Sequence, residues 1–146
     1  MTTASSPKPI VVTHERGLRF AAQVRQHRVV TDQSERAGGD DSAPSPTELI
    51  SAALGSCIAL YVHQFCESRG LPRDGLRVEV TPRNAANPNR IAELAVRVCL
   101  AAELPPHAME MLERVVRSCP VHNTLVHGAQ ISVALATGAR QYTTCG

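Results

Sequence analysis

Several residue types that mark common functions are scarce in this sequence or missing from it. There is no tryptophan, and aromatic residues make up 3% of the 146 residues. That is too few for the stacking platforms that bind single-stranded nucleic acid. Fifteen basic residues against thirteen acidic ones give a net charge of +2, a weak bias for binding nucleic acid or an anionic membrane. We therefore expect neither nucleic acid nor a membrane among the partners.

Long apolar runs and targeting signals are also lacking. The longest apolar stretch, residues 49–62, has 14 residues, whereas a membrane-spanning helix needs about 20. The opening residues, MTTASSPKPIVV, show no charged-then-apolar pattern of a secretion signal. These absences predict a cytoplasmic location.

The cysteines and histidines follow none of the common ligand patterns. The five cysteines are Cys57, Cys66, Cys99, Cys119 and Cys145. Their odd number and irregular spacing do not suit a secreted disulfide framework, and the absence of CxxC excludes a thioredoxin-type motif or a zinc ribbon. The histidines are scattered, and no phosphate-binding, dinucleotide-binding or nucleophile-elbow motif is present. We expect no metal and no cofactor, so the thiols are the candidate chemistry.

Hydrophobic patterning predicts an α+β fold with antiparallel sheets and a long central helix. Strands are expected at 9–14, 18–25, 27–32, 76–80, 91–100 and 129–136, and helices at 45–70, from 105 and at 120–126. This order lacks the regular strand–helix alternation of a doubly wound sheet. We expect a flexible tail over 1–8, one domain over 9–138 and a second tail over 139–146. In the strand at 18–25, Leu18, Phe20, Ala22 and Val24 are expected to form the buried face.

The central helix carries the clearest local signals. Ser45 is a natural N-cap, Pro46 suits the first helical position, and Glu48 completes an S-x-x-E capping box. The half of the helix over residues 49–62 is apolar nearly all round. Such a helix must be covered on every side.

Two cysteines stand out by their local setting, although a packed core thiol is the alternative for each. Cys57 lies in the apolar half of the long helix among small neighbours, and it needs a positive partner to react. Cys119 precedes Pro120, which starts a helix and places Cys119 at its N-cap, where free N–H groups stabilise a thiolate. The Cys119–His122 spacing suits a metal, but there is no second pair to complete a zinc site.

Three segments carry a family resemblance. The segments are PSPTEL at 44–49, LGSC at 54–57 and CPVHNTL at 119–125. With them the sequence resembles the OsmC/Ohr family (osmotically inducible protein C and organic hydroperoxide resistance protein), and its OsmC-like branch most closely. The resemblance extends from about residue 10 to residue 136. The glycine-containing segment at 37–41 fits as well. The resemblance implies an intertwined homodimer with two active sites at the subunit interface.

The resemblance also implies a thiol peroxidase that acts in oxidative-stress defence. Cys57 is then the peroxidatic thiolate, which attacks an organic hydroperoxide and becomes a sulfenic acid. Cys119 resolves it as an intramolecular disulfide, and a dithiol reductant of the lipoyl or thioredoxin type reopens that bond.

One position departs from the family pattern. Family peroxidases carry a carboxylate ten residues before the first cysteine, where it orients a thiolate-stabilising arginine, and this sequence has Thr47 there. Glu48 is one residue later, about 100° further round the helix. Arg36 is the nearest match to the arginine, and the alternatives are Arg16, Arg19 and Arg28. Thr47 also favours a second hypothesis, a non-catalytic OsmC-like protein that binds a small molecule.

Overall fold

The computed structural model describes residues 8–138 and 140–145. The chain divides into two compact units. The first runs to Ala53 and includes Val80–Val96, and the second holds Leu54–Glu79 and everything from Arg97 onward. The single domain expected over 9–138 stays a prediction, and the residues before Lys8, where a tail was expected, lie outside the described residues.

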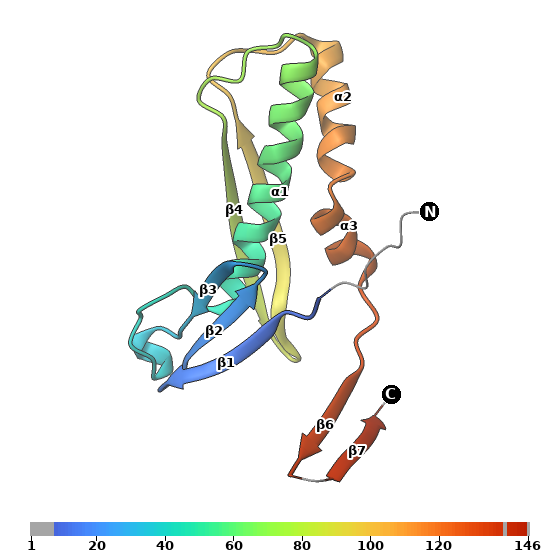
Figure 1. The fold of residues 1–146 in the computed structure, drawn as a ribbon. Coiled ribbons are helices and arrows are strands. Elements are labelled where there is room, and N and C mark those ends of the chain that lie inside the picture. The colour runs from blue at the N-terminus through green and yellow to red at the C-terminus, as the bar shows by residue number, and fades with distance from the viewer. Residues whose placement is uncertain (1–7, 139, 146) are drawn as a thin grey trace. The chain divides into compact units, whose positions relative to one another are not determined.

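The first unit begins with a three-stranded antiparallel sheet, as the patterning predicts. Its strands are β1 (Val11–Arg16), β2 (Arg19–Val24) and β3 (His27–Thr31), in the order β1-β2-β3 (Figure 1). Gly17, with φ of +50°, occupies the turn between β1 and β2, where a glycine adopts the left-handed backbone without strain.

The predicted buried face of β2 is wrong for the larger side chains. Ala21 is the buried residue of this strand, at 8% exposure, whereas Leu18 and Phe20 are 41% and 38% exposed. Alternation along a strand separates two faces but does not say which face the chain covers. The larger apolar side chains therefore lie on a face that the described chain leaves open.

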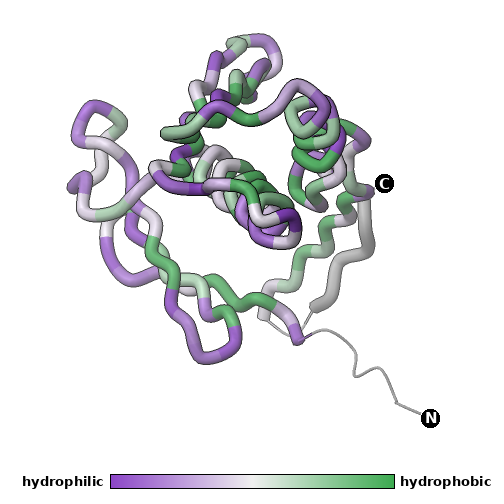
Figure 2. The backbone as a smooth tube through the Cα atoms, turned by 90° about the horizontal axis from the view of Figure 1, so that it is seen from above, coloured by the Kyte–Doolittle hydropathy of each residue, from purple (hydrophilic) through white to green (hydrophobic). Residues whose placement is uncertain are grey.

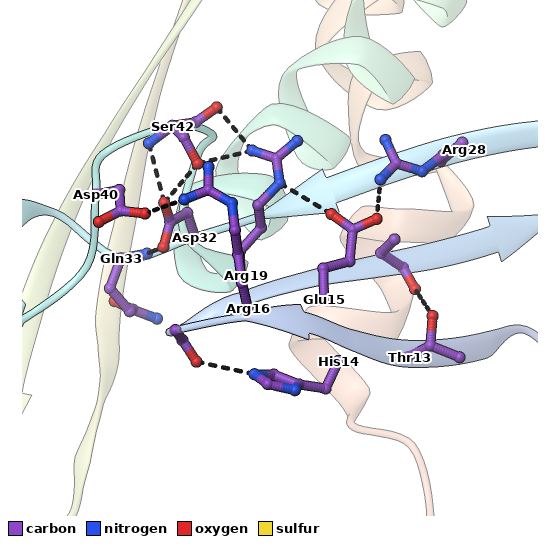
Figure 3. Close-up of polar contacts among 12 residues, drawn as sticks. Thr13, His14, Glu15, Arg16, Arg19, Arg28, Asp32, Gln33, Asp40 and Ser42 are labelled. Atoms are coloured by element: carbon purple, nitrogen blue, oxygen red, sulfur yellow. Dashed lines mark hydrogen bonds and ion pairs between the residues drawn. The ribbon is translucent and has the colours of Figure 1, made fainter.

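The polar loop after β3 is tied at both ends by one carboxylate. Asp32 is buried, and its Oδ2 accepts hydrogen bonds from the Ser42 hydroxyl at 2.6 Å and the Ser42 N–H at 3.0 Å (Figure 3). Its Oδ1 accepts from the N–H of Gln33 at 2.8 Å. These donors, the Ser42 hydroxyl first, lower the pKa of Asp32 to about 2. The ionised Asp32 carboxylate thus holds the two ends of the loop together.

The glycine pair of this loop has a steric reason. Within the loop lies η1 (Glu35–Ala37), which ends at Gly38 with φ of +87°. A side chain on Gly39 would overlap the carbonyl of Gln33 and come within 2.9 Å of Asp32 Oδ1. The close approach of the two ends of the loop therefore requires glycine at this position.

Helix α1 (Pro46–Ser68) begins and ends where the sequence predicts. The capping box is formed, because the Ser45 N–H donates to Glu48 Oε2 at 2.7 Å and the Glu48 N–H donates to Ser45 Oγ at 3.4 Å. At the other end Gly70 has φ of +62°, and the N–H of Leu71 donates to the carbonyl of Cys66 at 2.9 Å. This is a Schellman motif, which satisfies carbonyls that the helix leaves unpaired.

Helix α1 buries only one stripe of its apolar surface. The buried residues share one side of the helix and are Leu54, Ile58, Val62, Phe65 and Cys66. Ile50 and Leu60 are 40% and 51% exposed, so the cover expected on every side is not supplied by the described chain. Figure 2 shows the apolar character of this helix. By length and composition α1 is apolar enough to cross a membrane, a property that core helices of soluble proteins share.

Strands β4 (Arg77–Ala86) and β5 (Asn89–Cys99) form a two-stranded sheet. The first strand was expected to end at residue 80, and this bound is wrong, because β4 continues to Ala86. Arg83 Nη2 pairs with Glu93 Oε2 across the two strands at 2.7 Å. Cross-strand pairing with β5 keeps the residues after 80 extended.

The second unit continues with α2 (Pro106–Arg117) and α3 (Pro120–His127), both as predicted. A hairpin of β6 (Val133–Thr137) and β7 (Arg140–Cys145) follows, with Leu135 opposite Tyr142. The tail expected over 139–146 is therefore corrected, since residues 140–145 form β7. Strand β6 also starts later than the expected residue 129. A short strand beyond a glycine turn has too few residues to show alternation.

We predict that Asp32 makes the stability of the protein sensitive to acid. A carboxylate whose pKa is lowered on folding stabilises the folded state above its unfolded pKa and loses that effect as the pH falls through its folded pKa. The Tm of the unmodified protein should therefore fall steeply between about pH 4 and about pH 2. Asp32→Asn should have a lower Tm at neutral pH and a shallower fall, measured by thermal unfolding followed by circular dichroism.

Asp41→Asn is the control, since Asp41 is exposed and lies in the same loop. It should unfold like the unmodified protein at each pH. If the Tm of Asp32→Asn and the Tm of Asp41→Asn fell equally with decreasing pH, the prediction would be contradicted.

Candidate functional site

The fold brings two cysteines together that are far apart in the sequence. Cys57 lies on α1, and Cys119 lies between α2 and α3, both within the second unit. A hydrogen bond joins the two thiols. Both are free cysteines; Cys119 is fully buried and Cys57 is half-buried. The structure thus contains a reduced thiol pair with one member partly open to solvent.

Cys119 is placed by the start of α3. It is the N-cap of the helix, with φ of −61° and ψ of 132°, as the sequence predicts. Its Sγ accepts a hydrogen bond from the backbone N–H of His122 at 3.4 Å. Proline at the next position fits the first turn of a helix because it has no N–H to leave unpaired. The Cys-Pro pair therefore fixes where this sulfur sits.

The surroundings of Cys57 favour its protonated form. Burial, the largest effect, raises the pKa of this thiol, and its hydrogen bond to Cys119 and the charge of that group raise it further. The backbone N–H of Val121 donates to Cys57 and lowers the pKa in part. Within the described part of the second unit, no arginine acts on Cys57. To react as a thiolate, Cys57 needs groups that offset the effect of burial.

Three of the four candidate arginines are bound to groups of the first unit (Figure 3). Arg16 pairs with Asp40 at 2.6 Å. Arg19 pairs with Glu15 at 2.9 Å, and Arg28 pairs with the same carboxylate. Arg28 and then Arg19 hold the pKa of Glu15 below its usual range. These arginines hold the sheet and its loop together.

Arg36 differs from the other three. It lies exposed in η1 and has no hydrogen bond or ion pair within the described residues. It belongs to the same unit as Glu48, whose Oε2 accepts from the Ser45 N–H and, at 2.8 Å, from the Ser45 hydroxyl. These bonds, the backbone one first, lower the pKa of Glu48. Its Oε1 makes no hydrogen bond in the described part of the chain.

The remaining thiols have different surroundings. Cys66 is buried, and burial raises the pKa of its thiol while the charge of Arg73 opposes this. Cys99 is half-buried and lies 4.0 Å from Arg77 Nη2. Among the described residues, no three histidine, cysteine or acidic side chains are grouped as metal ligands. Among the described cysteines, Cys57 and Cys119 are the two that the fold brings together.

Sequence reasoning missed the backbone amide of Val121. The signal was present, because Pro120 takes the first helical position and has no N–H, so Val121 carries the first amide donor of α3. That the donor would meet the sulfur of Cys57 could not be predicted, since it depends on how the helices pack.

We predict that Cys119→Ala lowers the pKa of Cys57. The substitution removes the hydrogen bond and the charge that disfavour the Cys57 thiolate. The pH at which Cys57 reacts half-maximally with iodoacetamide, followed by peptide mass spectrometry, should move downward. Cys99→Ala, which alters no group acting on Cys57, should leave it unchanged. An unchanged or higher midpoint in Cys119→Ala would contradict the prediction.

Known structures share this fold. A protein of Psychrobacter arcticus described as an osmotic stress induced and detoxification response protein is 25% identical, with a TM-score of 0.75, over 84% of this chain and 90% of that one. The organic hydroperoxide resistance protein OsmC of Legionella pneumophila is 13% identical, with a TM-score of 0.61, over 83% and 91% of the two chains. A Vibrio cholerae organic hydroperoxide resistance protein, with captopril in one of its active sites, is 15% identical, with a TM-score of 0.56, over 85% and 88%.

No curated protein sequence matches the chain significantly. The family model for OsmC-like protein matches residues 39–134, which include α1, the β4–β5 sheet, both later helices and the thiol pair. The chain therefore belongs to the OsmC-like protein family.

Proposed function

We propose that this protein is a cysteine-based peroxidase that reduces organic hydroperoxides in oxidative-stress defence. The observation that carries the proposal is the hydrogen-bonded pair of free thiols, Cys57 and Cys119, of which Cys57 is the more accessible. The chain's family and the hydroperoxide resistance proteins that share its fold support a redox role in stress.

The reaction divides between the two sulfurs. The Cys57 thiolate attacks the distal oxygen of the hydroperoxide, the O–O bond breaks, and the alkoxide takes a proton and leaves as an alcohol. Cys57 is left as a sulfenic acid. The Cys119 thiol then attacks that sulfur, a disulfide forms and water leaves, which balances the two-electron reduction of the peroxide. A dithiol reductant of the lipoyl or thioredoxin type opens the disulfide by exchange.

Arg36 is our proposed stabiliser of the Cys57 thiolate. A guanidinium near a thiolate lowers its pKa, which opposes the effect of burial on Cys57. Of the four candidate arginines, Arg36 is the one without a partner in the described residues. Glu48 is proposed to orient it through Oε1, since only Oε2 is used by the helix cap.

A homodimer is part of the proposal, because the described chain leaves much apolar surface open. Ile131, Val133 and Leu135, before and within β6, are 83%, 59% and 67% exposed. On α1, Ile50 and Leu60 are exposed too. Apolar surface on this scale marks an interface, and a second copy would supply cover for it. We also propose a cytoplasmic location, where free thiols such as these stay reduced.

A second candidate function is binding of a small molecule without turnover. Thr47 stands in place of the family carboxylate, and the raised pKa of Cys57 lowers the fraction of thiolate at neutral pH. Captopril occupies one of the active sites of the Vibrio cholerae relative. Repeated reduction of hydroperoxide by this protein, with a dithiol in excess, would exclude this alternative.

The peroxidase proposal predicts a specific disulfide. One equivalent of cumene hydroperoxide or a fatty-acid hydroperoxide should consume two free thiols per chain and join Cys57 to Cys119, as peptide mapping would show. Cys66 and Cys99, whose surroundings do not bring two thiols together, should stay reduced and serve as internal controls. Finding both Cys57 and Cys119 still reduced would refute the proposed peroxidase activity.

The same assay tests Arg36. Arg36→Ala should slow disulfide formation by about tenfold or more, the effect of losing a cation beside a thiolate. Arg90→Ala is the matched control, because Arg90 is also an exposed arginine of the first unit. Equal rates for the two variants would remove Arg36 from the mechanism and leave the thiol pair in place.

The dimer is tested by sedimentation equilibrium. The unmodified protein should sediment as a dimer, and Leu135→Lys should weaken association by about tenfold or more, since an unpaired charge is costly to bury in an apolar interface. Thr137→Lys, a charge added at a polar position of the same strand, should have a smaller effect. A monomeric unmodified protein at micromolar concentration would contradict the dimer.

A further inference from the structure

The first turn of α3 has amide donors that its own helix does not use. In any α-helix the first N–H groups have no acceptor in a preceding turn. Here the first helical residue is Pro120, which has no N–H, and the next two donors belong to Val121 and His122. The N–H of Asn123 is the first to enter the helix ladder, donating to the Cys119 carbonyl at 3.0 Å.

Each of the two free amides meets a sulfur atom. The N–H of Val121 donates to Cys57 on α1, and the N–H of His122 donates to Cys119 Sγ at 3.4 Å. Consecutive residues of one helix start therefore hold the two members of the thiol pair. Figure 1 shows α3 in direct continuation of α2 within this unit, where its N-terminal end carries Cys119.

Side-chain bonds fix this helix start. Thr124 Oγ1 donates to the Pro120 carbonyl at 2.8 Å, and Asn123 Nδ2 donates to the Ser118 carbonyl at 3.3 Å. Such bonds hold the first turn in place relative to the residue that precedes the cap. The amides are thereby held toward the sulfurs before any reaction begins, as a preorganised anion site requires.

The direction of these amides suits a thiolate better than a thiol. Hydrogen bonds to an ionised acceptor are stronger than those to a neutral one, and the N-terminal end of a helix favours negative charge. Of the groups that act on Cys57 within the described part of this unit, Val121 is the one that favours ionisation. The other titratable group that faces Cys57 is Cys119, and it acts in the opposite sense.

We propose that the first turn of α3 is part of the catalytic machinery: the backbone N–H of Val121 donates to the Cys57 sulfur and favours its thiolate, and the N–H of His122 holds the Cys119 sulfur in place. The inference rests on the proposed function for its account of Cys57 as the nucleophile. It deepens that proposal, because the chain itself supplies a donor to the reacting sulfur where Thr47 replaces the family carboxylate. Both thiols use one helix start, so the same element serves the attack on peroxide and the resolving step.

Val121→Pro tests the amide directly, because it removes the N–H from a first-turn position where proline is tolerated. Val121→Ala is the matched control, which trims the side chain and keeps the amide. His122→Gln, which keeps its amide, shows whether titration of the imidazole contributes to the profile. The readout is the rate at which Cys57 reacts with iodoacetamide as a function of pH, resolved by peptide mass spectrometry on the full reduced chain.

Loss of one charge-assisted hydrogen bond lowers the thiolate fraction by about tenfold or more, and the greater nucleophilicity of a more basic thiolate offsets part of that. At neutral pH we expect Val121→Pro to react about threefold to tenfold more slowly than Val121→Ala, with its midpoint at higher pH. Superimposed profiles for these two variants would overturn the inference.

If circular dichroism shows that Val121→Pro shifts the helix start, an ester linkage at this position replaces it. Incorporating the α-hydroxy acid that corresponds to valine removes the N–H and keeps the side chain. Its profile should show the same slowing, and a profile equal to that of the unmodified protein would overturn the inference.

Failure of the proposed function gives a different result. If the unmodified protein forms no Cys57–Cys119 disulfide with hydroperoxide while the alkylation profiles still separate, the peroxidase is refuted and the role of the Val121 amide stands. If the disulfide forms and the profiles coincide, the peroxidase stands and the role of the amide is refuted.

Discussion

The contact between the sulfurs of Cys57 and Cys119 is the interaction on which the functional interpretation of this protein depends. It exists because a stripe of α1 that includes Leu54, Ile58 and Val62 is buried within the second unit while the Cys-Pro pair fixes the start of α3. Neither sulfur is exceptional alone. One is a helical thiol beside small residues and the other is a helix cap. Together they form a pair in which a chemical change at one sulfur is felt at the other.

Burial has two opposing effects on the pair of thiols, Cys57 and Cys119. In the proposed reaction, burial would protect a reactive sulfur intermediate from water, but it also disfavours the ionised form of Cys57 that would attack the peroxide. The amide dipole of Val121 would offset this effect without a further buried charge. In the proposed mechanism Arg36, which is exposed in η1, would favour the thiolate through its full charge instead. The two effects add, because each favours ionisation of Cys57.

Local signals in the sequence predicted local structure well. The capping box at Ser45, the helix end expected at residue 70 and the N-cap at Cys119 each depend on a few neighbouring residues, and each is present in the structure. Features set by distant contacts were not predictable in the same way. Strand β4 continues beyond residue 80, to Ala86, because it pairs with β5, and β7 forms because it pairs with β6.

The candidate site shows the same limit. The two cysteines and their helical settings could be read from spacing and from a family resemblance, whereas the donor from Val121 depends on packing between helices. The side chains of Leu18 and Phe20 were assigned to a buried face by alternation, but alternation cannot tell a face covered by the same chain from one left for another molecule.

Cys119 has two structural roles, because it is a member of the thiol pair and also the N-cap of α3. Its sulfur accepts the His122 N–H at the start of α3 and also interacts with Cys57. In the proposed reaction, the disulfide would form at the same atom that caps α3. Oxidation would then change the acceptor of the His122 N–H, and hydrogen exchange of the amides in this turn would report it.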